Sequence, residues 1–232
     1  MRKFLAGSGL PGVLLFLCAL PLTASAQSYA GDIQFPKTIA WSAYPTGTGG
    51  YSQAVAIGNI LQRQYSTNLR VIPGRNDVSR LATLRAERVH FSAGGSESVY
   101  AQEGVLNFAS KIWGPQPVRA MLSNYSDACS YSIATAADAD IRSMADMKGK
   151  RMTFVQGAPS LNNATAALLA YANLTWDDVI PVEVGGYNGS IDAVLNDRAD
   201  AAGGAPVEDD RRVARPEAQA EDALRVRALV VV

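Results

Sequence analysis

The sequence predicts an α/β fold built around a parallel sheet. Short apolar runs that are typical of buried strands alternate with segments whose apolar residues recur at helical spacing. Glycine-containing turns separate strand from helix at residues 47–50, 74–77 and 94–97. This alternation is typical of a parallel sheet with helices on both faces. Ligands of such sheets bind at the carboxyl ends of the strands, where all three turns are expected to lie.

The first strand–turn–helix unit, residues 38–61, is the one around which the rest of the chain is organised. Residues 39–44 form an apolar, aromatic-rich run that predicts a strand, and Ala54, Ile57 and Leu61 mark one face of the helix that follows. Free backbone N–H groups at the start of that helix would suit an anion such as a small carboxylate. The glycines could also serve only to turn the chain. Their spacing matches neither the phosphate loop nor the dinucleotide fingerprint, which disfavours a nucleotide.

The N-terminal residues have the features of an export signal. Arg2 and Lys3 supply positive charge, residues 13–20 supply a short apolar core, and the ASA sequence at residues 24–26 is a small-residue cleavage site. The apolar run is too short to anchor the chain stably in a bilayer. We therefore expect residues 1–26 to be a signal peptide that directs a soluble chain to the periplasm.

The mature chain would be nearly neutral, with 19 basic and 21 acidic residues and a formal charge of −2. This balance gives no electrostatic reason to expect nucleic acid as a partner. Cys129 would be the only cysteine left, so no internal disulfide is expected. We interpret His90, the single histidine, as a structural residue of a strand. No His/Cys cluster has metal-ligand spacing, so we expect no metal, no cofactor and no enzyme.

The same reasoning extends along the chain. The paired carboxylates Asp177 and Asp178 precede a predicted strand and are expected to cap a turn. Residues 156–160 form a second polar, glycine-containing turn before a helix, which repeats the first unit. Further strands are predicted at residues 69–72, 90–91, 118–122, 131–135, 152–155, 179–184 and 200–202, and further helices at residues 77–88, 96–102, 141–151, 161–172 and 191–195.

Four motifs, taken in order, resemble the TAXI group of solute-binding proteins, which are the extracytoplasmic receptors of certain TRAP transporters. They are GTGGY at residues 47–51, SESVYA at 96–101, SMADMKGKR at 143–151 with GAPS at 157–160, and GYN at 186–188 with IDAVL at 191–195. The resemblance covers residues 38–204. The third motif alone is shared by many periplasmic binding proteins, so the specific signal is the order of all four.

The resemblance implies a two-lobed α/β fold of the periplasmic-binding-protein type (type II-like), with a mostly parallel sheet in each lobe and an incomplete second lobe. Lobe 1 would span residues 27–124 and lobe 2 residues 125–205. Such a monomeric receptor closes on a small organic acid or acidic amino acid, such as glutamate or 2-oxoglutarate, and delivers it to a TRAP-type membrane permease. Carried over by position, the ligand-binding candidates are Thr48, Gly49, Gly50, Tyr51, Ser96, Glu97, Ser160, Asn162, Asn163 and Tyr187.

Two charged residues at the predicted rim bear on the ligand. Arg75 follows a strand end and could hold a carboxylate with two hydrogen bonds, although it could instead pair with Asp77. Glu97 starts a predicted helix, where it could accept an ammonium group or only stabilise the helix dipole. Arg75 and Glu97 together would suit a zwitterion such as glutamate. Without Glu97 in the cleft, a dicarboxylate that lacks an amine fits better.

The sequence departs from the TAXI pattern in two places. Asn162 and Asn163 stand where those proteins usually carry acidic or hydroxyl residues, so the ligand is expected to differ. Residues 206–232 form an atypical charged tail, with six acidic and five basic residues and no aromatic residue. We interpret this change as a frameshift or truncation, or alternatively as a charged helix over residues 216–230.

Two other classes of function remain open. The receptor of an ABC-type importer uses the same two-lobed architecture. An exported enzyme could use the glycine-rich loop to hold an anion.

Overall fold

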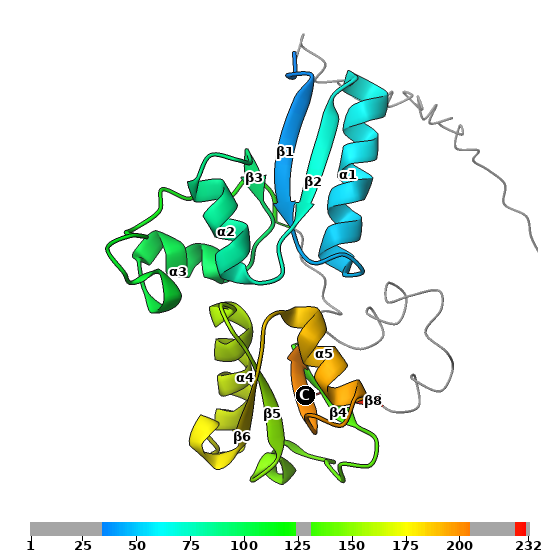
Figure 1. Ribbon diagram of the computed structural model, residues 1–232, viewed down its shortest axis with the longest axis vertical. Coiled ribbons are helices and arrows are strands. Elements are labelled where there is room, and N and C mark those ends of the chain that lie inside the picture. Colours follow the sequence, from blue (N-terminus) through cyan, green and yellow to red (C-terminus); the bar gives the residue numbers. More distant parts are fainter. Residues whose placement is uncertain (1–33, 124–130, 205–225, 231–232) are drawn as a thin grey trace, which may run out of the picture. The chain divides into compact units, whose positions relative to one another are not determined.

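The computed structural model describes residues 34–123, 131–204 and 226–230, whose strands form two separate sheets (Figure 1). We call residues 34–123 the first lobe and the described residues from 131 onward the second lobe. The predicted signal peptide, Cys129 and the predicted lobe boundary lie outside the described residues. The described residues from Phe35 onward belong to one compact unit.

The first lobe contains a three-stranded parallel sheet in the order β2-β1-β3. Because its strands are parallel, their carboxyl ends share one edge, and each is followed by a loop and a helix, as predicted. The elements are β1 (Thr38–Ala43), α1 (Gly49–Tyr65), β2 (Asn68–Pro73), α2 (Asp77–Arg85), β3 (Phe91–Ser92), α3 (Glu97–Glu103) and the short 3₁₀ helix η1 (Leu106–Phe108).

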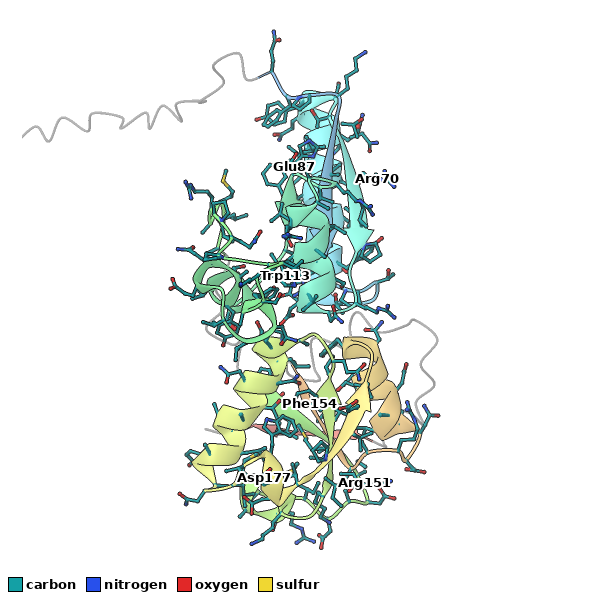
Figure 2. The ribbon with its side chains drawn as sticks, turned by 60° about the vertical axis from the view of Figure 1, so that its left-hand side comes forward. Arg70, Glu87, Trp113, Arg151, Phe154 and Asp177 are labelled. Carbon is teal, nitrogen blue, oxygen red and sulfur yellow. The ribbon has the colours of Figure 1, made fainter. Side chains whose placement is uncertain are left out.

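Small residues let α1 approach the sheet closely. Ala54 is fully buried, and a Cβ atom built at Gly58 would lie 3.2 Å from the Cβ of Leu69 on β2. The helices that follow β2 and β3 share a separate apolar cluster of Leu81, Ala101 and Phe108 with partly buried neighbours. Trp113 closes this cluster through an edge-on contact with Phe108, with the ring centroids 5.0 Å apart (Figure 2).

The second lobe contains a five-stranded sheet in the order β6-β5-β7-β4-β8. Strand β5 pairs in parallel with β6 and β7, whereas β4 pairs antiparallel with β7 and β8. The elements are β4 (Ser132–Ala136), the 3₁₀ helix η2 (Met144–Met147), β5 (Arg151–Val155), α4 (Pro159–Tyr171), the 3₁₀ helix η3 (Trp176–Asp178), β6 (Ile180–Val184), α5 (Tyr187–Leu195), β7 (Ala201–Gly204) and β8 (Val226–Val230).

Helices cover both faces of this sheet. Successive residues of a strand point to opposite faces, so neighbouring residues of β4 pack against different helices. Ile133 of β4 belongs to a core that includes Leu169 of α4 and the two methionines that bound η2. The next residue, Ala134, belongs to a second core that includes Val194 of α5. The predicted α/β architecture, with helices on both faces of a sheet, is therefore confirmed for the second lobe.

An ion pair holds β5 to the turn before β7. Both the backbone N–H and the guanidinium of Arg151 donate to the Asp200 carboxylate, with a shortest distance of 2.6 Å (Figure 2 labels Arg151). Partial burial alone would raise the pKa of Asp200, but the hydrogen bonds from Arg151 bring it below its usual value.

Three predicted elements are wrong. Residues 118–122 form no strand, because no described strand pairs with them, and Met121 and Leu122 stay exposed. The helix predicted over residues 141–151 and closed by Gly149 is reduced to η2, because the backbone is extended at its N-cap Ser143 and leaves the helical conformation again at Lys148. The alternative C-terminal helix fails at residues 226–230, which form β8.

Two smaller predictions are confirmed. His90 is structural, since its Nδ1 accepts the backbone N–H of Ala40 at 3.0 Å. Asp178 caps a turn by accepting from the backbone N–H and hydroxyl of Thr175.

Candidate functional site

The glycine-rich loop before α1 is held by its own polar groups. The Thr48 hydroxyl donates to the carbonyl of Pro45 at 2.7 Å and accepts the backbone N–H of Tyr51 at 3.3 Å, so it caps α1. Its hydrogen bonds are therefore made within the turn. Gly49, in contrast, has open space beside it.

Gly50 is required by the packing of Tyr44. A Cβ atom at Gly50 would lie 2.4 Å from the Tyr44 ring. This close approach gives one of the predicted anion-loop glycines a structural role. The ring it accommodates lies over a buried charged cluster.

That cluster is centred on Arg80, whose side chain is only 2% exposed. Its Nη2 atom lies 2.9 Å from an Asp77 carboxylate oxygen and 2.8 Å from a Glu97 carboxylate oxygen, and its Nε donates to the Ala93 carbonyl. The guanidinium carbon lies 4.0 Å from the centroid of the Tyr44 ring, which is a cation–π contact. We call Tyr44, Asp77, Arg80 and Glu97 the Arg80 cluster.

The Arg80 cluster contains two carboxylates and one guanidinium, so with both acids ionised it carries a net charge of −1. Burial and the nearby Glu97 raise the pKa of Asp77, although Arg80 opposes this shift. Burial alone would lower the pKa of Arg80, but its contacts with Tyr44, Glu97 and Asp77 hold it above the usual value. Burial and Glu97 raise the pKa of Tyr44 to about 12, so its phenol stays neutral. The cluster therefore has more hydrogen-bond acceptors than donors, and one further positive charge would make it neutral.

Ser160 in the first turn of α4 donates to the remaining carboxylate oxygens of this cluster, and the backbone N–H of Gly95 also donates to Glu97 Oε2 at 2.7 Å. Its backbone N–H donates to Asp77 Oδ2 at 2.9 Å, and its hydroxyl donates to Glu97 Oε2, also at 2.9 Å. The Ser96 hydroxyl donates in turn to the Ser160 hydroxyl at 3.0 Å. The structure thus brings together three predicted site residues, Ser96, Glu97 and Ser160.

The other predicted residues take different positions. Arg75 is exposed and does not pair with Asp77, its predicted alternative partner, because Arg80 takes that carboxylate. The Arg75 carbonyl accepts the backbone N–H of Tyr187 at 3.3 Å. Asn162 binds both backbone groups of Val155 and so joins α4 to β5.

The last predicted residue, Asn163, lies on the exposed side of α4. Its side-chain amide donates to the hydroxyl of Tyr100 at 2.8 Å. It lies on the same helix as Ser160 but outside the Arg80 cluster.

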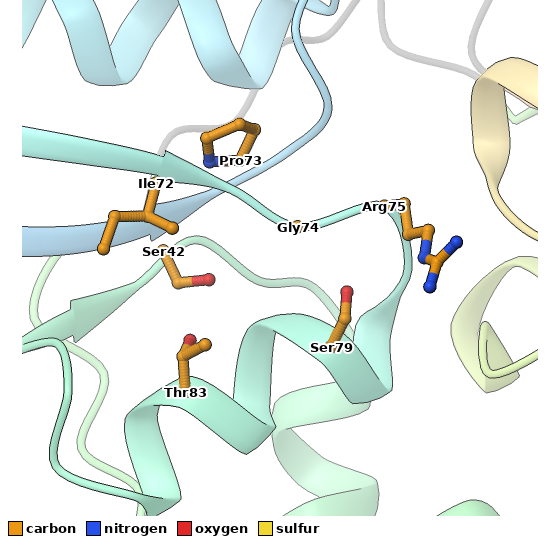
Figure 3. Close-up of a pocket in the computed structure, with 7 residues that line it drawn as sticks. All are labelled: Ser42, Ile72, Pro73, Gly74, Arg75, Ser79 and Thr83. Carbon is orange, nitrogen blue, oxygen red and sulfur yellow. The ribbon is translucent and has the colours of Figure 1, made fainter.

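A cavity of about 390 Å³ lies beside this cluster in the first lobe (Figure 3). It is bordered by the ends of β1 and β2, the loop between β2 and α2, and one side of α2. Its lining residues are Ser42, Ile72, Pro73, Gly74, Arg75, Ser79 and Thr83.

Sequence reasoning missed Tyr44 and Arg80. The only local signal for Arg80 was its position three residues after Asp77, on a helix face that it shares with apolar residues. Among the residues that the structure describes, no group of three His, Cys, Asp or Glu side chains could hold a metal ion. No helix in the same part of the chain has the length and apolar character needed to cross a membrane.

Two α/β lobes that contact each other through their strand–helix loops and helix N-termini are typical of a solute-binding protein. A family profile described as "ABC transporter, phosphonate, periplasmic substrate-binding protein" matches residues 52–229. The chain therefore belongs to this family. Its members are extracytoplasmic binding proteins rather than enzymes. The match includes most of residues 206–232, the stretch predicted to be an atypical tail. The matching family is not the TAXI group.

Solved structures agree with this fold. The chain is similar to the alkanesulfonate-binding protein SsuA from Xanthomonas axonopodis pv. citri, bound to MOPS, with 17% identity, a TM-score of 0.51, and coverage of 72% of this chain and 54% of that one. The aliphatic sulphonate-binding protein SsuA from Escherichia coli gives 16% identity, a TM-score of 0.52, and coverage of 84% and 57%. The holo form of ArgBP from T. maritima gives 13% identity and a TM-score of 0.54, with coverage of 84% of this chain and 79% of that one.

The chain spans just over half the length of the two sulfonate-binding proteins. At these identities the similarity shows a shared fold. A search of curated proteins finds no match to this sequence.

Proposed function

We propose that this protein is the receptor of an ABC-type importer and that it captures a small zwitterion, an organic acid that also carries an ammonium group. Family membership supports the receptor role and the ABC-type partner. The chemistry of the ligand is inferred from the contacts between the two lobes.

The observation that carries the proposal is the pairing of Ser160 with Asp77. The backbone N–H of Ser160 belongs to the positive end of α4, a helix of 13 residues, and it already holds a carboxylate. A carboxylate, phosphonate or sulfonate of a ligand would find the same donors, the Ser160 N–H and hydroxyl. We therefore assign the acidic group of the ligand to α4.

The opposite side of the contact calls for a cation. If a ligand enters between Ser160 and the Arg80 cluster, Asp77 Oδ2 loses the donor that Ser160 supplies, while Glu97 Oε2 loses the Ser160 hydroxyl and keeps the backbone N–H of Gly95 at 2.7 Å. Buried carboxylate oxygens without donors are costly, and Arg80 neutralises only one of the two charges. An ammonium group would restore both the hydrogen bonds and the charge balance.

The remaining predicted residues surround this position in the proposal. Ser96 would support the Ser160 hydroxyl, and the open backbone at Gly49 would face the ligand with Tyr51. Arg75 and Tyr187 meet through their backbones beside the same contact and would close over it.

Isothermal titration calorimetry with matched ligand pairs tests the ligand class. The pairs differ only by an ammonium group: glutamate and glutarate, 2-aminoethylphosphonate and ethylphosphonate, and 2-aminoethanesulfonate and ethanesulfonate. We expect the ammonium member of the pair that binds to be at least tenfold tighter, about 1.4 kcal/mol. Equal binding within a pair, or tighter binding of the plain acid, would contradict the zwitterion.

A second candidate is delivery of a carboxylate to a TRAP-type permease, which the four sequence motifs favour. Uptake of the identified ligand by cells that carry the partner permease separates the two. ABC-type delivery predicts uptake that needs ATP and is blocked by orthovanadate. TRAP-type delivery predicts uptake that collapses with the ion gradient instead.

A further inference from the structure

The cavity between the first-lobe sheet and α2 contains a hydroxyl without a protein partner. Ser42 is 1% exposed, and its Oγ is one of two buried side-chain polar atoms that have no hydrogen-bond partner among the described residues. Leaving a buried hydroxyl unpaired is unfavourable. Figure 3 shows this oxygen pointing into the space between β1 and α2.

Two more hydroxyls point into the same space from α2 (Figure 3). The Thr83 hydroxyl donates to the Arg80 carbonyl at 2.7 Å, so its oxygen retains lone pairs that can accept. The Ser79 hydroxyl already has partners, because it accepts the backbone N–H of Asn76 and donates to the Asn76 carbonyl. A helix that packs on a sheet normally presents apolar side chains to it, so this polar lining indicates a site.

The rest of the lining carries no charge into the cavity. Ile72, which pairs with Ser42 across the strands, and Pro73 supply apolar walls. Arg75 contributes to the rim, but its guanidinium points away from the hydroxyls (Figure 3). The cavity therefore suits a short uncharged group with a hydrogen-bonding end. Its volume is at the lower end of the range for small-molecule sites, roughly 300–1,000 Å³.

The cavity is next to the contact to which the zwitterion is assigned. Its rim includes Gly74 and Arg75, and the Arg75 carbonyl accepts from Tyr187 of the second lobe. The next residue, Asn76, donates its side-chain amide to the Gln156 carbonyl at 2.9 Å. A ligand held between Ser160 and the Arg80 cluster could therefore extend a tail past this loop.

We infer that this cavity is a specificity subsite that accepts the tail of the ligand, a short uncharged chain ending in a hydroxyl or amide that pairs with Ser42 Oγ and Thr83 Oγ1. The inference rests on the proposed zwitterion receptor and adds a preference among zwitterions. The buried end of the tail donates to Thr83 and exchanges a hydrogen bond with Ser42.

Calorimetry on the purified protein tests the subsite with pairs that differ by one tail hydroxyl. They are homoserine and 2-aminobutyrate, and 1-amino-3-hydroxypropylphosphonate and 1-aminopropylphosphonate. The proteins are the wild type, Ser42→Ala, Thr83→Val, and the control Ser110→Ala, which changes an exposed serine beyond η1. We expect the wild type and the control to prefer the hydroxyl member about five- to tenfold, the size of one net hydrogen bond. Ser42→Ala should reduce this preference to within twofold, and Thr83→Val should reduce it in part.

The outcomes separate the subsite from the receptor itself. If Ser42→Ala binds one pair as the wild type does, with the same hydroxyl preference, the subsite is wrong and the receptor proposal stands. The subsite is also wrong, and the receptor proposal again stands, if the wild type binds both members of a pair equally well. If the wild type binds no zwitterion from either experiment, the receptor proposal fails and the subsite fails with it.

Discussion

The backbone N–H of Ser160 donates to the carboxylate of Asp77 at 2.9 Å, although the two residues are 83 positions apart in the sequence. The first turn of α4 is therefore occupied by an acid from the protein itself. In the proposed mechanism a ligand replaces this internal acid with its own and offers its ammonium group to the carboxylates that Ser160 leaves.

Replacing Asp77 with Asn tests this exchange directly. The amide keeps the shape of the side chain but removes one negative charge, so the Arg80 cluster becomes neutral. We expect Asp77→Asn to bind ethylphosphonate about fivefold more tightly, since the competing carboxylate is gone, and to lose most of the preference for an ammonium group. Calorimetry with 2-aminoethylphosphonate and ethylphosphonate measures both effects. The control is Asp140→Asn on the exposed surface of the second lobe, and an unchanged ammonium preference in Asp77→Asn would contradict the account.

Arg80 is expected to be essential for stability. Arg80→Met removes the only cation between Asp77 and Glu97 and leaves two buried acids unpaired, which should lower the free energy of unfolding by about 3–5 kcal/mol. Urea denaturation followed by circular dichroism measures this change. Arg88→Met, at an exposed position just beyond α2, should cost less than about 0.5 kcal/mol. Similar losses in the two variants would mean that the Arg80 cluster contributes little.

Tyr44 should make stability fall in alkali. Burial and Glu97 raise its pKa from about 10 to about 12 in the folded protein, so the folded state retains a proton that the unfolded state releases. The stabilisation is fully present below pH 10 and is lost as the pH rises toward 12. Denaturation of the wild type and of Tyr44→Phe at several pH values isolates this residue, because other tyrosines are common to both. Equal pH slopes above pH 10 would show that the Tyr44 pKa is not raised.

Gly203 should tolerate no side chain. A Cβ atom there would lie 2.3 Å from the Thr165 hydroxyl and 2.4 Å from the Tyr131 hydroxyl, so Gly203→Ala should lower stability by about 1–3 kcal/mol through overpacking. Gly185→Ala is the matched control in the same lobe, because nothing lies within 4 Å of its added Cβ atom. Thermal melts of both variants make the comparison, and a Gly203→Ala melt equal to that of the control would contradict this packing.

The sequence predicted most strands and helices because their signals are local. The apolar run that became β1 and the helical spacing of Ala54 and Leu61 need no information from distant residues. The strand predicted at residues 118–122 failed for the converse reason. An apolar run becomes a strand only when another strand pairs with it, and none does so in the described part of the chain.

The candidate site was only partly predictable. Ser96, Glu97 and Ser160 were found through the loops they occupy, but their partners were not. Arg80 reaches Glu97 across 17 positions, and a helical arginine ordinarily points to solvent. Ser42 could not be recognised either, because a single serine in a strand becomes notable only when its surroundings leave it without a partner.

The most direct test of the central claim is a thermal melt of the purified protein with and without candidate ligands. The panel contains glutamate, 2-oxoglutarate, 2-aminoethylphosphonate, ethylphosphonate, phosphate and a nucleotide. A zwitterion at about one hundred times its dissociation constant should stabilise the folded state by roughly 2.7 kcal/mol and raise the melting temperature by a few degrees. The account predicts a cooperative melt that one zwitterion shifts more than its plain-acid analogue. A melt shifted only by phosphate or the nucleotide, or by no member of the panel, would contradict it.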